Sequence, residues 1–210
     1  GTGLGTRLGD RRGGPERLNL EDPDAVTALH LESLAAGAGI LRTNTFCASG
    51  EELRSLGLSH RAEDLARAGA ELARAAGRKV DAAPLCLGVI GPGAGVGEGS
   101  GVAGADSGRI RGLLAGGVDG ILVETLPGVS AARRIVRAIR TESALVPVLI
   151  SFSPLEDGQL TGGGSALDIA RAAHELEVDL VGLNCSFGPN PMDGPLAAIR
   201  EAWDGPLGAW

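Results

Sequence analysis

Short apolar runs alternate with helical patterns along nearly the whole chain. The runs cover residues 40–46, 85–90, 121–123, 148–152, 180–183 and 207–210, and a shorter apolar fragment lies at residues 2–4. Runs of this length, rich in Val, Ile and Leu and bounded by turn-forming residues, are typical of buried β-strands. The pattern therefore predicts six clear strands and part of one more at the start of the chain.

Helical periodicity fills the intervals between these runs. We expect helices beginning at residue 22, over 61–76, over 107–114, around 135–139, beginning at 165 and over 196–203. Asp22 and Pro23 are typical of an N-cap followed by proline at the first helical position. Ser165 and Asp168 have the spacing of a capping box, with Asp in place of the usual Glu or Gln.

Strands that alternate with helices predict a parallel sheet, because parallel neighbours need a helical crossover. Both a doubly wound open sheet and a closed barrel satisfy this rule. Long polar loops after the strands favour a (β/α)8 TIM-type barrel of the α/β class, whose site lies at that end of the strands. The glycine-rich stretch 91–97 lacks the Lys-Ser/Thr pair of a phosphate loop, and the first strand is not followed by a Gly-x-Gly-x-x-Gly turn. Such a barrel usually needs about 250 residues. We therefore expect residues 1–210 to form a single barrel domain that is incomplete at its last strands.

Composition narrows the class of protein further. A net charge of −7 argues against partners such as nucleic acid or an anionic membrane, which select for basic surfaces. No apolar run approaches the roughly 20 residues that span a bilayer. The three cysteines, Cys47, Cys86 and Cys185, are too few and too widely spaced for a disulfide framework, so we expect a reducing, cytoplasmic location.

Polar residues stand where successive predicted strands end: Asn44, Glu124, Ser151, Asn184 and Cys185. In a parallel barrel these ends face one mouth, so the side chains are candidates for a common site. Glu124 fits a substrate-ammonium acceptor, a general base or half of a structural ion pair, and it needs a partner if buried. Cys185 fits a thiolate ligand, a nucleophile or simply a small buried hydrophobe. No metal-binding His-Glu-x-x-His motif, paired-Cys motif or Ser-His-Asp pattern is present.

The motifs occur in an order that is itself informative. They are GLGTRL at 3–8, AGAGILRTNTF at 36–46, VIGP at 89–92, GVDGILVET at 117–125, VLISF at 148–152 and VGLNCS at 181–186. This ordered set resembles the homocysteine S-methyltransferase family of zinc-dependent enzymes, which use S-methylmethionine, betaine or methylcobalamin as methyl donor. The resemblance runs along nearly the whole chain.

The resemblance implies roles for four of the strand-end residues. Cys185 matches the first of three cysteine thiolates that hold Zn²⁺, and Glu124 matches the acid that binds the homocysteine ammonium. Asn44 and Asn184 would line the same substrate-binding mouth. The two further zinc cysteines lie in a Gly-Gly-Cys-Cys motif, which we expect beyond residue 210. Gly1 stands where the family carries an Asp, and the loop 93–104 lacks the family's aromatic residues.

The resemblance predicts a zinc-dependent homocysteine S-methyltransferase that makes methionine. The alternative is a barrel of the same family that has lost catalysis and acts as a binding or structural domain. A barrel lyase or aldolase would need a lysine at a strand end, and the only lysine, Lys79, follows a predicted helix. The methyl donor and the oligomeric state stay open.

Overall fold

A computed structural model describes residues 7, 14–48, 53–54, 56–80, 83–93, 103–186, 188 and 190–210, with backbone alone at 103–106. The chain packs as two compact units, residues 1–94 with 101–121 and residues 95–100 with 122–210. The strand predicted at residues 2–4 lies outside the described residues, and so does the position of Gly1.

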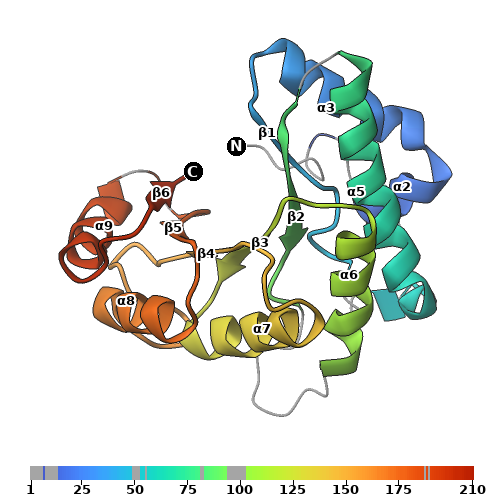
Figure 1. The fold of residues 1–210 in the computed structure, drawn as a ribbon. Coiled ribbons are helices and arrows are strands. Elements are labelled where there is room, and N and C mark those ends of the chain that lie inside the picture. Colours follow the sequence, from blue (N-terminus) through green and yellow to red (C-terminus); the bar gives the residue numbers. More distant parts are fainter. Residues whose placement is uncertain are drawn as a thin grey trace. The chain divides into compact units, whose positions relative to one another are not determined.

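The first unit contains two strands and the helices that flank them (Figure 1). Its elements are η1 Pro15–Arg17, α2 Leu18–Glu21, α3 Pro23–Ala35, β1 Ile40–Arg42, η2 Ser59–Arg61, α5 Ala62–Lys79, β2 Leu85–Ile90 and α6 Ala103–Ala115. Strands β1 and β2 are parallel, with Ile40 opposite Leu85. Helix α6 packs closely on α5, because a Cβ at Gly112 would stand 2.2 Å from the Glu63 carbonyl oxygen. Glycine thus replaces bulky packing at this helix pair.

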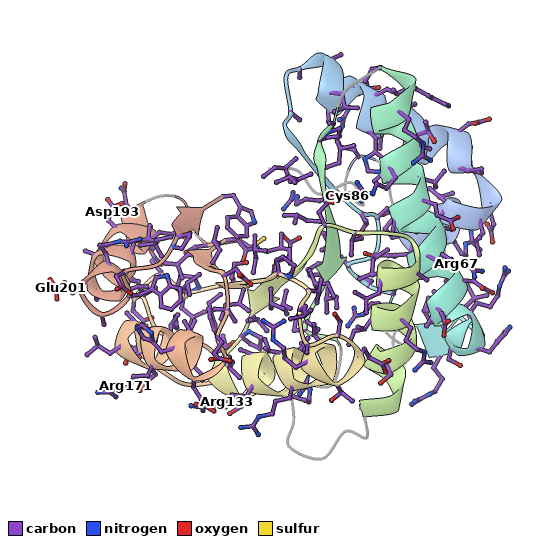
Figure 2. All side chains as sticks on the ribbon, viewed as in Figure 1. Arg67, Cys86, Arg133, Arg171, Asp193 and Glu201 are labelled. Carbon is purple, nitrogen blue, oxygen red and sulfur yellow. The ribbon has the colours of Figure 1, made fainter. Side chains whose placement is uncertain are left out.

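The second unit repeats the alternation of strand and helix. Its elements are β3 Gly120–Leu126, whose first residues belong to the first unit, α7 Val129–Glu142, β4 Val148–Phe152, α8 Ala166–Glu175, β5 Leu180–Leu183, α9 Asn190–Ala202 and β6 Leu207–Ala209. Strands β4, β5 and β6 are parallel neighbours. Charged side chains such as Arg133, Arg171 and Glu201 point away from these strands (Figure 2).

All six strands belong to one sheet in the order β1-β2-β3-β4-β5-β6, so each strand lies beside its neighbour in sequence. Together with the helix between successive strands, this order confirms the predicted α/β class. None of the helices that the structure describes is long and apolar enough to cross a membrane.

Strands β2, β4 and β5 have the predicted bounds, whereas β1 ends at Arg42 and not at residue 46. One more backbone bond follows Arg42, from the Thr43 N–H to the Leu87 carbonyl at 3.0 Å, and threonine side chains then bond to the backbone of β2. The Val89 N–H donates to Thr43 Oγ1 at 2.9 Å, and Thr45 Oγ1 donates to the Val89 carbonyl at 2.7 Å. The chain therefore stays beside β2 while its own backbone leaves the strand pattern.

Helix α9 begins at Asn190 and not at residue 196. Two prolines, Pro191 and Pro195, are accommodated in its first two turns. Proline is favourable at the start of a helix because the first N–H groups have no intrahelical partner, and this applies to Pro191. Pro195 lies inside the helix, where a proline removes one backbone hydrogen bond. Helix α8 begins as predicted, with the complete capping box between Ser165 and Asp168.

In each unit an aspartate just before one strand bonds to the N-terminal end of the strand that precedes it in sequence. Asp119 accepts from the Cys86 N–H at 2.7 Å and donates its own backbone N–H to the Cys86 carbonyl. Asp179 makes the same pair of bonds with Val148, also with a side-chain bond of 2.7 Å. The two motifs extend the parallel ladder by one residue at the end opposite to the predicted site.

Candidate functional site

Asn184, the residue after β5, lies at the centre of a hydrogen-bonded cluster in the second unit. Its Oδ1 accepts from the Thr125 N–H at 3.0 Å and from Ser151 Oγ at 2.9 Å. Its Nδ2 donates to Thr125 Oγ1 at 2.9 Å and lies 3.3 Å from Cys185 Sγ. The side chain is 2% exposed, and these bonds use both its donors and both its acceptor positions. Asn184 therefore joins the ends of β3, β4 and β5.

Cys185 is the exposed member of this cluster. Its sulfur faces two donors, Nδ2 of Asn184 and, at 3.8 Å, Oγ1 of Thr125. Ser153 Oγ donates to the carbonyl of Cys185 at 2.9 Å and fixes the loop from the other side. Donors aimed at a sulfur suit one that accepts hydrogen bonds, as a thiolate does.

The backbone is left-handed at Cys185 itself and at Thr125, whose hydroxyl faces its sulfur. Thr125 has φ of 62° and Cys185 has φ of 52°. Residues other than glycine rarely adopt this region, and for the β-branched Thr125 it costs of order 1–3 kcal/mol. The hydrogen bonds of Asn184 hold Thr125 in this conformation at its N–H and its hydroxyl. Backbone strain of this kind clusters at functional sites.

Glu124 precedes Thr125 near the end of β3. The indole Nε1 of Trp210, which follows β6, donates to its Oε2 at 3.3 Å. The Trp210 backbone N–H donates in turn to the Leu183 carbonyl at 3.2 Å. The side chain of Glu124 is half-buried.

Asn44 belongs to the first unit and is 3% exposed. Its Nδ2 donates to the Pro15 carbonyl at 2.8 Å and to Asn19 Oδ1 at 3.0 Å. Asn19 Nδ2 donates to the carbonyls of Asn44 and Leu65. This network fixes the segment after β1 against η1, α2 and α5.

The other two cysteines have different surroundings. Cys86 is buried in β2, and burial raises the pKa of its thiol to about 11. Cys47 is half-buried, and its backbone N–H donates to Glu16 Oε1 at 2.8 Å. Only Cys185 thus combines an exposed sulfur with a polar cluster.

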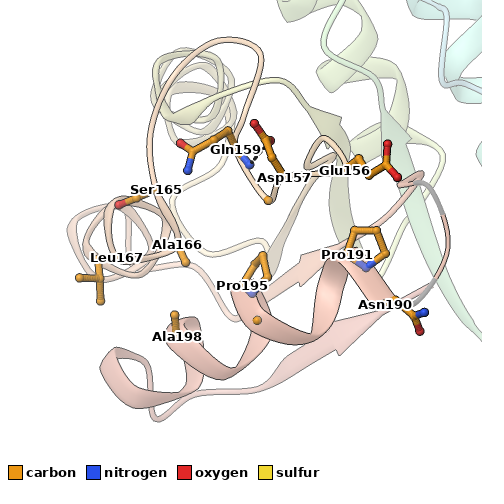
Figure 3. A pocket seen from close by; sticks show the side chains of 12 residues that line it. Glu156, Asp157, Gln159, Ser165, Ala166, Leu167, Asn190, Pro191, Pro195 and Ala198 are labelled. Atoms are coloured by element: carbon orange, nitrogen blue, oxygen red, sulfur yellow. Dashed lines mark hydrogen bonds between the residues drawn. The ribbon is translucent and has the colours of Figure 1, made fainter.

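A hollow of about 500 Å³ opens elsewhere on the second unit, between the loop after β4 and the starts of α8 and α9 (Figure 3). Its lining is Glu156, Asp157, Gly158, Gln159, Ser165, Ala166, Leu167, Asn190, Pro191, Gly194, Pro195 and Ala198. None of the strand-end residues predicted from the sequence lines this hollow, so it is distinct from the candidate site.

Sequence reasoning located the strand-end positions but did not single out Thr125 or Trp210. Thr125 is the last residue of the motif at 117–125, but no pattern in the sequence marks its hydroxyl as part of a site. Trp210 carried a usable signal, because an aromatic residue at a strand end is unusual in a chain with 2% aromatics. Among the described residues, no group of three or more His, Cys, Asp or Glu could hold a metal ion.

Comparisons with known proteins agree with this architecture. The metallated form of the homocysteine methyltransferase MmuM from Escherichia coli has a TM-score of 0.80 and 22% identity, covering 92% of this chain and 74% of that one. The likeness confirms the fold class, an incomplete TIM-type barrel.

Curated relatives match at the level of sequence. The methionine synthase of Mycobacterium leprae is 30% identical over 198 residues, which cover 89% of this chain and 16% of that protein. The S-methylmethionine–homocysteine S-methyltransferase of Pongo abelii is 31% identical over 207 residues, covering 89% of this chain and 49% of that protein. The chain thus spans about half or less of the length of these two relatives. The family model described as homocysteine S-methyltransferase matches residues 2–209, and the chain therefore belongs to the homocysteine S-methyltransferase family.

Proposed function

We propose that this protein transfers a methyl group to the thiol of homocysteine and so forms methionine. The observation that carries the proposal is the exposed sulfur of Cys185, held by donors from Asn184 and Thr125 at the ends of two strands. Membership of the family and the names of the relatives support the same reaction.

The hydrogen-bond donors around the sulfur of Cys185 fit a thiolate that is one ligand of a zinc ion. Cys185 would supply this ligand, and the resemblance to the family implies two further cysteine ligands. Zn²⁺, when bound, supplies a positive charge that keeps a thiol deprotonated at neutral pH. Asn184 acts on this ligand as an outer partner that orients the sulfur, which is how metal ligands are commonly supported.

The carboxylate of Glu124 binds the ammonium group of homocysteine in this proposal. Asn44 is the proposed substrate-binding residue of the first unit, through its amide oxygen, because both of its described bonds are donated by its nitrogen. Asn184 contributes through Thr125 and Cys185, since its own polar atoms are already bonded.

The chemical step needs a thiolate and an activated methyl group. The homocysteine sulfur forms a bond to the methyl carbon while the bond between that carbon and the donor breaks, and the electron pair leaves with the donor. The thiol proton is lost before this step. The protein's residues contribute mainly by holding the amino acid so that its sulfur faces the donor, which lowers the entropic barrier.

The test is methionine formation by the full-length protein, supplied with zinc, homocysteine and each of S-methylmethionine, betaine and methylcobalamin in turn. We expect one donor to be used, and Glu124→Gln to raise KM for homocysteine about tenfold or more, because a hydrogen bond between charged groups is lost. Cys47→Ser, at a cysteine outside the cluster, is the control and should retain activity. A protein that binds homocysteine and zinc but uses no donor would instead be an inactive member of the family.

The proposed setting is the reducing cytoplasm, with small molecules as the partners. Cys47, Cys86 and Cys185 are all free thiols, which supports this setting.

A further inference from the structure

The indole ring of Trp210 packs against two glycines, Gly182 and Gly208, which form a surface that we call the glycine seat. Gly182 in β5 and Gly208 in β6 are paired across the parallel ladder. A Cβ at Gly182 would stand 2.6 Å from the six-membered ring of Trp210, and one at Gly208 would stand 3.4 Å from it. Any residue larger than glycine at position 182 would therefore displace the indole.

Glycine inside a strand weakens the strand, so a pair of glycines in register needs a reason. The ring that covers them is one, because a strand glycine often marks a close approach by another group. The backbone N–H of Trp210 also donates to the Leu183 carbonyl, which fixes the Cα from which the ring extends. The indole is thus oriented by its backbone and by its seat.

From this seat the indole N–H reaches Glu124 Oε2 at 3.3 Å. A carboxylate offers about four acceptor positions on two oxygens, so one bond to Oε2 restricts its rotation and uses only one of these positions. The donor is neutral. This bond therefore orients the carboxylate without cancelling the negative charge that would attract an ammonium group.

We propose that Trp210 is a positioning residue that makes the site selective for thiols bearing an α-ammonium group, by fixing the carboxylate of Glu124. The inference rests on the proposed function, because it assumes that Glu124 binds the homocysteine ammonium. Trp210 contacts the carboxylate of Glu124, which would bind the ammonium group and not the thiol. Its effect should therefore appear in the ratio of affinities for ligands with and without an ammonium group.

The experiment compares two ligands of the full-length, zinc-supplied protein by titration calorimetry. The ligands are homocysteine and 4-mercaptobutanoate, which has the same thiol and carboxylate but no amino group. We expect the wild-type protein to bind homocysteine more tightly. Trp210→Phe keeps a ring on the glycine seat and removes the N–H, and it should lower the ratio of the two affinities about tenfold. The affinity for 4-mercaptobutanoate should change less than about twofold.

Trp203 offers a matched control. Its indole N–H donates to the Pro206 carbonyl at 3.0 Å, away from Glu124, so Trp203→Phe should leave the affinity ratio unchanged. Gly182→Ala keeps the indole but displaces it, and it should lower the ratio as Trp210→Phe does. Thermal melting of each variant shows whether it is folded, and either variant of the Trp210 seat suffices for the test.

The outcomes separate the inference from the proposed function. An unchanged ratio in folded Trp210→Phe, or equal weakening of both ligands, would overturn the role of Trp210 while Glu124 keeps its own. A wild-type protein that does not distinguish the two ligands would instead overturn the role of Glu124, and the inference with it.

Discussion

An asparagine follows a strand in each unit, yet the two residues are built into different surroundings. Asn44 is bonded to Pro15 and Asn19, and the network closes within buried structure. Asn184 is equally buried, but its network ends at the exposed sulfur of Cys185. The left-handed backbone at Thr125 and Cys185 occurs in the second network. The same pattern in sequence thus yields a network among buried groups in one unit and a strained network that ends at an exposed sulfur in the other.

The largest loss of stability should follow from removing the hydrogen bonds that Asn19 makes in the network around Asn44. Asn19→Ala removes the bonds to the Asn44 and Leu65 carbonyls and the acceptor of Asn44 Nδ2, leaving buried polar groups unpaired. We expect the free energy of unfolding to fall by about 3 kcal/mol. Urea denaturation measures it. A loss below about 1 kcal/mol would mean that this network is not what holds the segment after β1.

Removing the side chain of Asn184 should lower both the stability of the protein and its affinity for zinc. Asn184→Ala removes four polar contacts, and we expect a loss of roughly 2–3 kcal/mol in unfolding free energy. Zinc affinity of the full-length protein should fall at least tenfold, because an outer partner of Cys185 is removed. Asn19→Ala should leave the zinc affinity of the folded protein unchanged. Equal effects of the two substitutions on zinc would remove the contrast between the networks.

His30 in the first unit should make that unit sensitive to acid. The residue is 1% exposed, Nε2 has no hydrogen-bond partner among the described residues, and burial lowers the pKa of His30 from 6.5 to about 4. Between these pH values the unfolded chain binds a proton that the folded chain does not, so stability falls as pH decreases from about 6.5 towards 4. From pH 7 to pH 5 the loss should be about 2 kcal/mol.

The measurement is urea denaturation at the two pH values with His30→Leu beside the wild type. The variant should lose this part of the pH dependence. His174→Gln is the matched control in the second unit, where the exposed His174 contacts the Ala202 carbonyl, and it should leave the contribution of His30 in place. An identical pH dependence in His30→Leu and the wild type would exclude His30 as its source.

The smallest effect should come from relieving left-handed backbone outside the site. Glu177 follows α8 with φ of 48°, and its side chain is exposed. Glu177→Gly should stabilise the protein by about 0.5 kcal/mol, since glycine adopts this region without strain but loses more entropy on folding. Thr125→Gly should not stabilise, because the hydroxyl bonded to Asn184 is lost as well. Thermal melting compares the two variants, and stabilisation by Thr125→Gly would argue against a role for its hydroxyl.

Much of the architecture could be predicted because it is local. Strands β2, β4 and β5 are uninterrupted apolar runs, and the capping box of α8 is a short-range pattern. β1 is shorter than predicted because Thr43 and Thr45 bond to Val89, a partner that periodicity cannot reveal.

The sequence predicts which positions belong to the candidate site, but not the hydrogen bonds between them. Polar residues after strands marked Glu124, Asn184 and Cys185. The bonds that give them their environment join residues 59 and 86 positions apart, Asn184 with Thr125 and Trp210 with Glu124. Propensity also disfavours the left-handed conformation of Thr125, so its strain is a consequence of tertiary structure.

The most direct test of the central claim is the zinc content of the full-length protein with and without Cys185. The account predicts one zinc per chain in the wild type, a large loss in Cys185→Ala and retention in Cys47→Ala. Zinc absent from the wild type, or retained fully in Cys185→Ala, would contradict the assignment of the strand-end cluster as a thiolate–zinc site.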